Sequence, residues 1–267
     1  SDPLSIEKSL ESIHLPEGFS VELMAAEPLV LDPVAIDWGP DGKLWVVEMA
    51  DYPEGIDGKG KPGGRIRFLE DTTGDGRYDR SVVFLDGVNL PNGILPWKNG
   101  VLVTAAPEIF YAEDTDGDGK ADFRQILFQG FLEGNPQLRV NGLRWGLDNW
   151  IHCGSGAHHG GYGKDSVIVS VLTNQRTTVG SRDIRIRPET GLLEPESGPS
   201  QFGRTRDDWG PWSGVMTASP FWHPALPDRS LQQPSNLPPP APPHHYVVPL
   251  HLLPSPPNPP HNLPHVY

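Results

Sequence analysis

Polar side chains able to meet a ligand are most concentrated between residues 133 and 163. This stretch reads E-G-N-P-Q-L-R-V-N-G-L-R-W-G-L-D-N-W-I-H-C-G-S-G-A-H-H-G-G-Y-G and contains Gln137, Arg139, Asn141, Arg144, His152, His158 and His159. His158 and His159 lie in a Gly-rich loop, where backbone can approach a ligand closely and an imidazole can act as a general base. We therefore expect His158 or His159 to be catalytic. The alternative is a surface loop with two solvated histidines.

Two Asp-rich loops carry a second kind of chemistry. Acidic residues on alternate positions of a tight loop converge on one point, and a glycine at the sixth position permits the turn that lets a hard cation reach them. This pattern predicts a structural Ca²⁺ site, although both loops lack the Glu that an EF-hand has at position 12. The alternative is that D-G-rich loops are simply good hairpin turns. The candidate ligands are Asp114, Asp116, Asp118 and Asp122 in one loop and Asp71, Asp75 and Asp79 in the other.

Internal repeats indicate the elements that position these groups. Residues 70–87 and 113–130 are identical at eight of 18 positions, at an offset of 43. Segments that begin at Asp32, Leu90 and Arg139 each pair two short apolar alternations across a turn of the P-D-G, K-N-G or L-D-N kind. Such turns are typical of β-hairpins. A period of roughly 40–50 residues with about four strands per unit predicts an all-β fold, a β-propeller, with three clear units and a fourth.

Composition limits the classes of protein. The chain has 267 residues and a formal net charge of −13, which argues against a nucleic-acid or anionic membrane partner. No apolar run approaches the roughly 18 residues of a membrane helix. The first residues, S-D-P-L-S-I-E-K, do not resemble a signal peptide. One cysteine, Cys153, excludes an internal disulfide and a C-x-x-C-H haem attachment.

The composition changes near residue 226 and predicts two parts. Residues 1–226 contain all 30 glycines, whereas residues 227–267 contain 14 prolines and no glycine. We therefore expect a propeller domain over 1–226 and an extended, irregular Pro-rich tail over 227–267.

Other clusters are less specific. Glu48, Asp51 and Tyr52 follow a strongly apolar strand, where a propeller presents residues to its central channel. A second cluster, which either has a ligand role or forms an ion-paired turn, contains Arg204, Asp207, Asp208 and Trp209. The recurring tryptophans are expected to pack in the core; they are Trp38, Trp45, Trp97, Trp145 and Trp150.

Several motifs in order resemble one family. They are G-F-S-V-E-L-M-A-A-E-P-L-V-L-D-P-V-A-I-D-W-G-P-D-G-K-L-W-V-V-E-M-A-D-Y-P, E-D-T-T-G-D-G, N-G-L-R-W-G-L-D-N-W-I and Q-F-G-R-T-R-D-D-W-G. Over roughly 15–228 the chain resembles the N-terminal propeller of planctomycete-type membrane-bound dehydrogenase or haem-binding domain proteins. The resemblance implies a six-bladed propeller related to soluble quinoprotein glucose and sorbosone dehydrogenases. Blades of about 45 residues allow at most five in this chain, so we expect an incomplete ring.

The resemblance also implies a chemistry. Arg139 and Asn141 are similar to an Arg-Asn pair that holds pyrroloquinoline quinone (PQQ) in those enzymes, with Gln137 and Arg144 as further cofactor-binding candidates and His158 or His159 as the base. The first hypothesis is oxidation of a carbohydrate or alcohol, with electrons passed to a cytochrome c, in the periplasm or outside the cell. The second is a non-catalytic, Ca²⁺-stabilised propeller that binds polysaccharide or a protein partner. The third is a lactonase-like hydrolase with Glu48 or Asp51 as a metal ligand.

Overall fold

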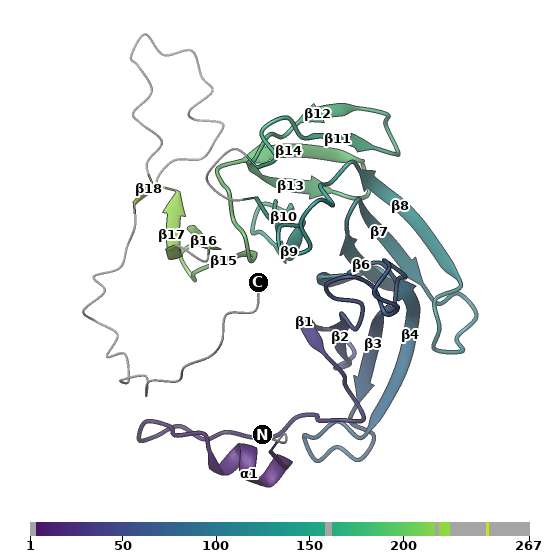
Figure 1. The fold of residues 1–267 in the computed structure, drawn as a ribbon, viewed down its shortest axis with the longest axis vertical. Helices are drawn as coiled ribbons and strands as arrows, with labels where there is room; N and C mark the ends of the chain where they lie inside the picture. The colour runs from purple at the N-terminus through teal and green to yellow at the C-terminus, as the bar shows by residue number, and fades with distance from the viewer. Residues whose placement is uncertain (1–3, 158–161, 217–218, 225–243, 246–267) are drawn as a thin grey trace.

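A computed structural model of the chain describes residues 4–157, 162–216, 219–224 and 244–245. Within these ranges it contains one short helix, α1 (Ile6–Glu11), and eighteen strands that form antiparallel sheets (Figure 1). The prediction of an all-β fold is therefore confirmed. No helix in the described ranges is long and apolar enough to cross a membrane.

The first sheet follows the order of the sequence. Its strands are β1 (Pro33–Trp38), β2 (Leu44–Glu48), β3 (Gly64–Glu70) and β4 (Arg80–Val88). In β3, Ile66 and Phe68 are buried while the intervening Arg65 and Arg67 are half-buried, as the alternation predicts. The P-D-G turn between β1 and β2 closes with Gly42 at φ 81° and a hydrogen bond from its N–H to the carbonyl of Gly39 (3.1 Å).

The second sheet has the same meander and two additional strands. It contains β5 (Gly93–Trp97), β6 (Gly100–Ala105), β7 (Glu108–Glu113) and β8 (Phe123–Gln129), and the hairpin of β11 (Val167–Ser170) and β12 (Arg176–Thr178) extends it beyond β8. Lys98 adopts φ 53° in the K-N-G turn between β5 and β6, which is the left-handed conformation that a two-residue hairpin turn requires. In β7, Phe110 and Ala112 are buried as well as Ile109 and Tyr111, so both faces of this strand are packed.

Two further sheets complete the described fold. The third contains β9 (Asn141–Trp145), β10 (Ile151–Gly154), β13 (Asp183–Arg187) and β14 (Leu192–Glu196). The fourth contains β15 (Arg204–Arg206), β16 (Trp212–Met216), β17 (Ser219–Pro224) and the two-residue β18 (His244–His245). Four sheets are therefore present where the repeats predict three units and a fourth.

The sheets lie side by side in an arc, with β1, β9 and β15 near its middle and β4, β8 and β12 at its periphery (Figure 1). The strand that opens each sheet packs against its counterpart in the next sheet: β1 against β5, β5 against β9, and β9 against β15. Apolar clusters fill the spaces between successive sheets. One contains Val47, Ile66 and Val103 from the first and second sheets, and another contains Ile109, Phe128 and Ile151 from the second and third.

The expectation that all the recurring tryptophans pack in the core is wrong for two of them. Trp45 and Trp150 are buried, and Trp97 packs half-buried against the core. Trp38 and Trp145 are 56 % and 44 % exposed. Both end the opening strand of a sheet, at the edge facing the middle of the arc, where no sheet in the described ranges covers them.

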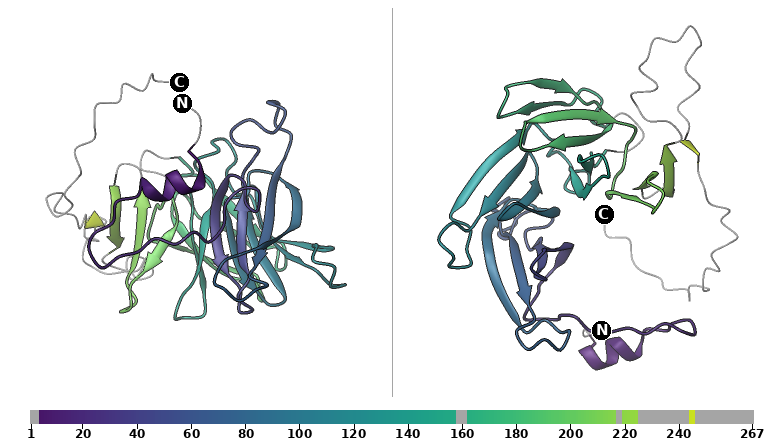
Figure 2. Two further views of the ribbon diagram at one scale, coloured as in Figure 1. Left: turned by 90° about the horizontal axis from the view of Figure 1, so that it is seen from below. Right: turned by 180° about the vertical axis from the view of Figure 1, so that it is seen from behind.

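Helix α1 adds little to the packing. Helix α1 begins after Ser5, whose side chain accepts a hydrogen bond from the N–H of Lys8, and none of its residues is buried. The right-hand view in Figure 2 shows α1 apart from the sheets. Of the predicted Pro-rich tail, 227–267, the structure describes residues 244–245 alone, so its predicted irregular conformation lies outside the described residues.

Candidate functional site

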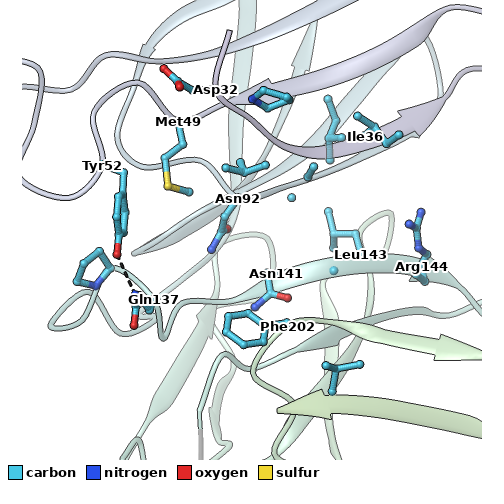
Figure 3. Close-up of a pocket in the computed structure, with 18 of the residues that line it drawn as sticks. Asp32, Ile36, Met49, Tyr52, Asn92, Gln137, Asn141, Leu143, Arg144 and Phe202 are labelled. Carbon is cyan, nitrogen blue, oxygen red and sulfur yellow. Dashed lines mark hydrogen bonds between the residues drawn. The ribbon is translucent and has the colours of Figure 1, made fainter. Parts of the chain in front are cut away.

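A cavity of about 1280 Å³ lies between the opening strands of the sheets (Figure 3). Its walls come from β1, β5 and β9, from the segments that lead into them, and from β16. Three of the four predicted cofactor-binding residues, Gln137, Asn141 and Arg144, line this cavity. Gln137 belongs to the loop before β9, and Asn141 and Arg144 belong to β9 itself. The fold therefore directs this polar segment to the cavity.

Two loops from different sheets meet at one end of the cavity. The side-chain Nε2 of Gln137 donates a hydrogen bond to the hydroxyl of Tyr52 (2.9 Å), which Figure 3 shows as a dashed line. Tyr52 belongs to the loop after β2, and its side chain, like that of Gln137, is exposed. An amide and a phenol joined in this way retain a free N–H, an amide oxygen and a phenolic O–H for a ligand.

Asn141 is fixed by its amide nitrogen, which donates to the carbonyls of Arg139 and Gln201 (2.8 Å each). Because both amide hydrogens are used, the side-chain oxygen is the group that can still accept a hydrogen bond. The next residue, Gly142, has φ 66°, and a Cβ there would collide with the Cα of Gly203. Glycine is therefore required where the third and fourth sheets approach each other beside Asn141.

Asn92 holds the corresponding place before β5. With its amide nitrogen turned inward, it donates to the carbonyl oxygens of Val140 (2.8 Å) and Thr104 (3.1 Å). This contact ties the start of the second sheet to the segment that leads into the third. Asn92 lines the cavity, and its hydrogen bonds to the backbone of Val140 and Thr104 fix the position of the wall around it.

The other end of the cavity carries an ion pair. The guanidinium of Arg144 lies 3.3 Å from the carboxylate of Asp37, which joins β9 to β1. Burial raises the pKa of Asp37, and the positive charge of Arg144 opposes that shift. Arg144 is thus largely neutralised by a protein carboxylate. Apart from it, the described lining offers one charged group, the side chain of Asp32.

Arg139, the fourth predicted cofactor ligand, does not line the cavity. Arg139 is 6 % exposed, and its Nη2 donates a hydrogen bond to the carbonyl of Glu133 (2.9 Å). Its Nε and Nη1 have no hydrogen-bond partner among the described residues, and burial lowers its pKa. Arg139 is thus enclosed in the loops behind the cavity rather than presented to a ligand.

The carboxylates considered as metal ligands in the channel are held by the protein itself. Glu48 is 1 % exposed. Its Oε1 accepts a hydrogen bond from the N–H of Leu31 (2.8 Å) and forms an ion pair with Arg67, whose Nε lies 2.8 Å away. Asp51 is fully buried, and its Oδ2 accepts from the N–H groups of Gly63 and Leu90 (3.2 and 2.8 Å). Neither lines the cavity. These contacts anchor loops and do not form a channel metal site.

His158 and His159, the candidate bases, lie outside the described residues. A different histidine, His152, is buried between two carboxylates: its Nδ1 lies 2.6 Å from Glu196 and its Nε2 lies 3.2 Å from Asp148. Its ring stacks on Trp212 of the fourth sheet (centroids 4.1 Å apart). This histidine is part of the contact between two sheets and lies outside the cavity lining.

Arg204 belongs to the same contact. Its Nη1 lies 2.8 Å from Glu196, its Nε lies 3.5 Å from Asp183, and its guanidinium stands over Trp212. Arg204 is buried, whereas Trp209 of the same sequence cluster is 88 % exposed. The cluster therefore divides into an ion pair between sheets and a surface turn.

The two Asp-rich loops differ in how many carboxylates converge. Ligand atoms of Asp114, Asp116 and Asp118 lie within 4.8 Å of one another, and this is the one group of three such residues in the described part of the chain. Asp122 instead accepts hydrogen bonds from the N–H and hydroxyl of Thr115.

The first Asp-rich loop has the same closing contact. Asp79 accepts from the N–H and hydroxyl of Thr72 (3.0 and 2.7 Å), as Asp122 does in the second loop. Asp71 accepts from the N–H groups of Gly74 and Gly76. Asp71 and Asp75 are left without a third carboxylate because Thr73 occupies the middle position.

The sequence pattern missed several cavity residues. Asp32, Met49 and Phe202 belong to the lining, but no local motif marks them. Asn92 could have been found from the repeat, because N-G-I-L at 92–95 corresponds to N-G-L-R at 141–144. Tyr52, in contrast, belongs to the cluster of Glu48, Asp51 and Tyr52 that the sequence itself singles out.

Comparison with known proteins gives one family. The sequence model of a family described as "Domain of unknown function (DUF7133)" matches residues 5–251. The match covers all four sheets and continues past residue 226, where the composition changes. Comparison with curated proteins gives no match.

Proposed function

The chain belongs to the family described as a domain of unknown function, DUF7133, and we propose that it is an incomplete β-propeller that binds a carbohydrate or another neutral polyol between its inner strands. The observation that carries this proposal is the convergence of Tyr52, Gln137 and Asn141 on one cavity whose single cation is already paired.

The sheet arrangement supports the propeller. The first sheet and the first four strands of the second are antiparallel meanders in sequence order, and each opening strand packs against that of the next sheet. Propeller blades have this order and this inner packing. The hairpin of β11 and β12 lies in sequence between β10 and β13 of the third sheet but pairs with the second sheet. An insertion between β10 and β13 therefore explains why the second sheet has six strands.

The chemistry of the cavity supports a neutral hydroxylated ligand. Each hydroxyl group donates one hydrogen bond and accepts others, so its site needs both kinds of partner. Gln137 and Tyr52 can donate, and Gln137 and Asn141 can accept. Phe202 is 53 % exposed at the same wall and offers a ring face. Sugars are bound through combinations of this kind because they have both polar edges and apolar faces.

The described lining does not fit PQQ. That cofactor carries several carboxylates and needs several cations around it. The lining has Arg144, which pairs with Asp37, and adds the carboxylate of Asp32. Arg139, expected to hold the cofactor, is enclosed elsewhere. We therefore derive no hydride transfer here. The dehydrogenase activity, the resemblance to planctomycete-type proteins, the cytochrome c acceptor and the periplasmic or extracellular location remain predictions.

A structural Ca²⁺ ion in the second Asp-rich loop is part of the proposal. Support comes from the three convergent carboxylates of Asp114, Asp116 and Asp118 and from the positive φ of Gly117 and Gly119, which each follow one of these aspartates. The ion would hold together the loop between β7 and β8. Adding Ca²⁺ should raise the Tm of the chain, and Asp116→Asn should abolish the rise. Asp75→Asn in the first loop is the matched control and should leave the rise intact.

The ligand proposal is tested by titrating the full chain with a panel of mono- and disaccharides and polyols by calorimetry. We expect at least one saturable ligand, with affinity reduced about five- to tenfold by Gln137→Ala, since a neutral hydrogen bond is worth about 1 kcal/mol. Gln125→Ala is the control, because Gln125 is an exposed glutamine on β8 outside the cavity.

A parallel titration with PQQ and Ca²⁺ tests the alternative. Saturable PQQ binding, with reduction of a dye by a sugar, would contradict the neutral-ligand proposal and favour the dehydrogenase. No binding of any sugar by a folded sample would refute the proposal itself.

A further inference from the structure

Beyond its polar end, the cavity is lined mainly by apolar side chains. Val34 and Ile36 project from β1 and are 49 % and 43 % exposed, although they belong to the cavity wall. Ile94, Leu143 and Met216 of β5, β9 and β16 also border the cavity but are buried, so the accessible apolar surface comes mainly from β1. A ligand that covered the side chains of Val34 and Ile36 would gain the free energy of removing their apolar surface from water.

The neutral hydrogen-bonding side chains of Tyr52 and Gln137 and the exposed apolar side chain of Ile36 lie at different ends of the cavity, and the ion pair of Arg144 lies at the end of Ile36. In Figure 3 Tyr52 and Gln137 lie at one end, Asn141 and Phe202 lie in the middle, and Ile36, Leu143 and Arg144 lie at the other end. The order of residues along the strands gives the length of this gradient. Asn141 and Arg144 are separated by three residues of β9, about 10 Å at the rise of a strand. Asp32 and Ile36 are separated by four residues, about 13 Å.

We propose that the ligand of this cavity is a neutral amphiphile, a glycoside whose sugar lies against Tyr52, Gln137 and Asn141 and whose apolar aglycone extends along Val34 and Ile36. This inference rests on the proposed function and adds the part of the ligand that a free sugar lacks. The separation of the two lining types selects a molecule with a polar head and an apolar tail. An unsubstituted sugar would leave the wall of β1 exposed.

The charge at the far end argues that the tail is uncharged. The Arg144 guanidinium is 3.3 Å from Asp37, so an anionic tail would have to displace a protein carboxylate and a cationic tail would meet the guanidinium. An anionic tail would thus compete with Asp37 for the guanidinium, and a cationic tail would be repelled by it. An alkyl or aromatic aglycone can instead pass over the paired groups and contact the apolar wall.

The test compares the sugar that binds best with its methyl, butyl and octyl glycosides, below their critical micelle concentrations, on the full chain. We expect Kd to fall with tail length, by up to about fourfold for each methylene that is buried. Ile36→Ser should reduce this dependence, so that the octyl glycoside binds more nearly like the methyl glycoside. Val171→Ser is the matched control: Val171 is 41 % exposed but lies outside the cavity, and the variant should retain the full dependence.

The outcomes separate this inference from the proposed function. Binding of the free sugar with no effect of tail length would overturn the amphiphile and leave the carbohydrate site standing. A tail effect of equal size in the Ile36→Ser variant would also overturn it, because the tail would then lie elsewhere. Binding of the octyl glycoside alone, lost in Ile36→Ser, would support the apolar wall. No binding of either compound would refute both proposals.

Discussion

Replacing Glu196 by glutamine should lower the free energy of unfolding more than replacing an exposed glutamate of the same strand, because the carboxylate of Glu196 joins the third sheet to the fourth. Glu196 ends β14 and accepts from Nδ1 of His152 (2.6 Å) and Nη1 of Arg204 (2.8 Å). The side chain is 18 % exposed, so solvent screens these contacts only partly. Both ring nitrogens of His152 face carboxylate oxygens, that of Glu196 at Nδ1 and that of Asp148 at Nε2.

The magnitude follows from these contacts. A hydrogen bond to a charged group contributes about 1.5–3 kcal/mol, and removing one partner of a buried ion pair costs about 3–5 kcal/mol. Glutamine keeps the size of the side chain and one acceptor oxygen. We therefore expect Glu196→Gln to lower the free energy of unfolding by about 2–4 kcal/mol at pH 7, measured by urea denaturation.

Glu194 provides the matched control on the same strand. It pairs with Arg185 at 2.6 Å, but its side chain is 50 % exposed. Exposed ion pairs contribute about 0–1 kcal/mol, so Glu194→Gln should have a small effect. If the two variants lost equal stability, the contact between the third and fourth sheets would not depend on the buried carboxylate, and the reasoning would be refuted.

The pH dependence gives a second check. Burial alone would raise the pKa of Glu196, but the hydrogen bond from His152 and the charges of Arg204 and Arg185 outweigh it and lower the pKa below the ordinary 4.5. A carboxylate with a lowered pKa contributes stability above its unfolded pKa and loses it as the pH falls through the folded value. The difference between the native chain and Glu196→Gln should therefore shrink below about pH 4.5. A difference that stays constant down to pH 3 would contradict this assignment.

Three further expectations follow from the fold. Gly142→Ala should be more destabilising by about 1–3 kcal/mol than Gly87→Ala, because both have positive φ but only the Cβ at position 142 meets Gly203; equal losses in urea denaturation would contradict this. Burial and Glu113 raise the pKa of Tyr111 to about 12, so the native chain should lose stability relative to Tyr111→Phe as the pH rises from 10 to 12, and parallel profiles would count against it. Trp209 is 88 % exposed, so Trp209→Ala should change the free energy of unfolding by less than about 0.5 kcal/mol; a larger loss would mean that the ring is covered.

Local patterns predicted the elements of this fold well. Alternation of Ile66 and Phe68 with two arginines predicts β3, and turn residues such as those at 98–100 place the hairpins. These signals are local, because side-chain direction and turn geometry depend on neighbouring residues. The hairpin of β11 and β12 carries strand signals too. Its membership in the second sheet was not readable, because it depends on the pairing of Val169 and Ser170 with Gln129 and Phe128.

The candidate site was predicted in part for the same reason. Gln137, Asn141 and Arg144 stand close together in a polar segment, and the fold brings them to one cavity. Arg139 stands among them but is turned into the loops, which its residue type does not reveal.

The cavity partners from distant segments could not be read from spacing. Tyr52 meets Gln137 across 85 residues, and Asp37 meets Arg144 across two opening strands. Only tertiary packing sets such contacts.

The most direct test of the central claim is a crystal structure of the full chain with the glycoside that binds it best. The account predicts a sugar ring within hydrogen-bond distance of Gln137 and Asn141, with its aglycone against Ile36. Density for the ligand elsewhere on the surface, with this cavity filled by solvent, would contradict it.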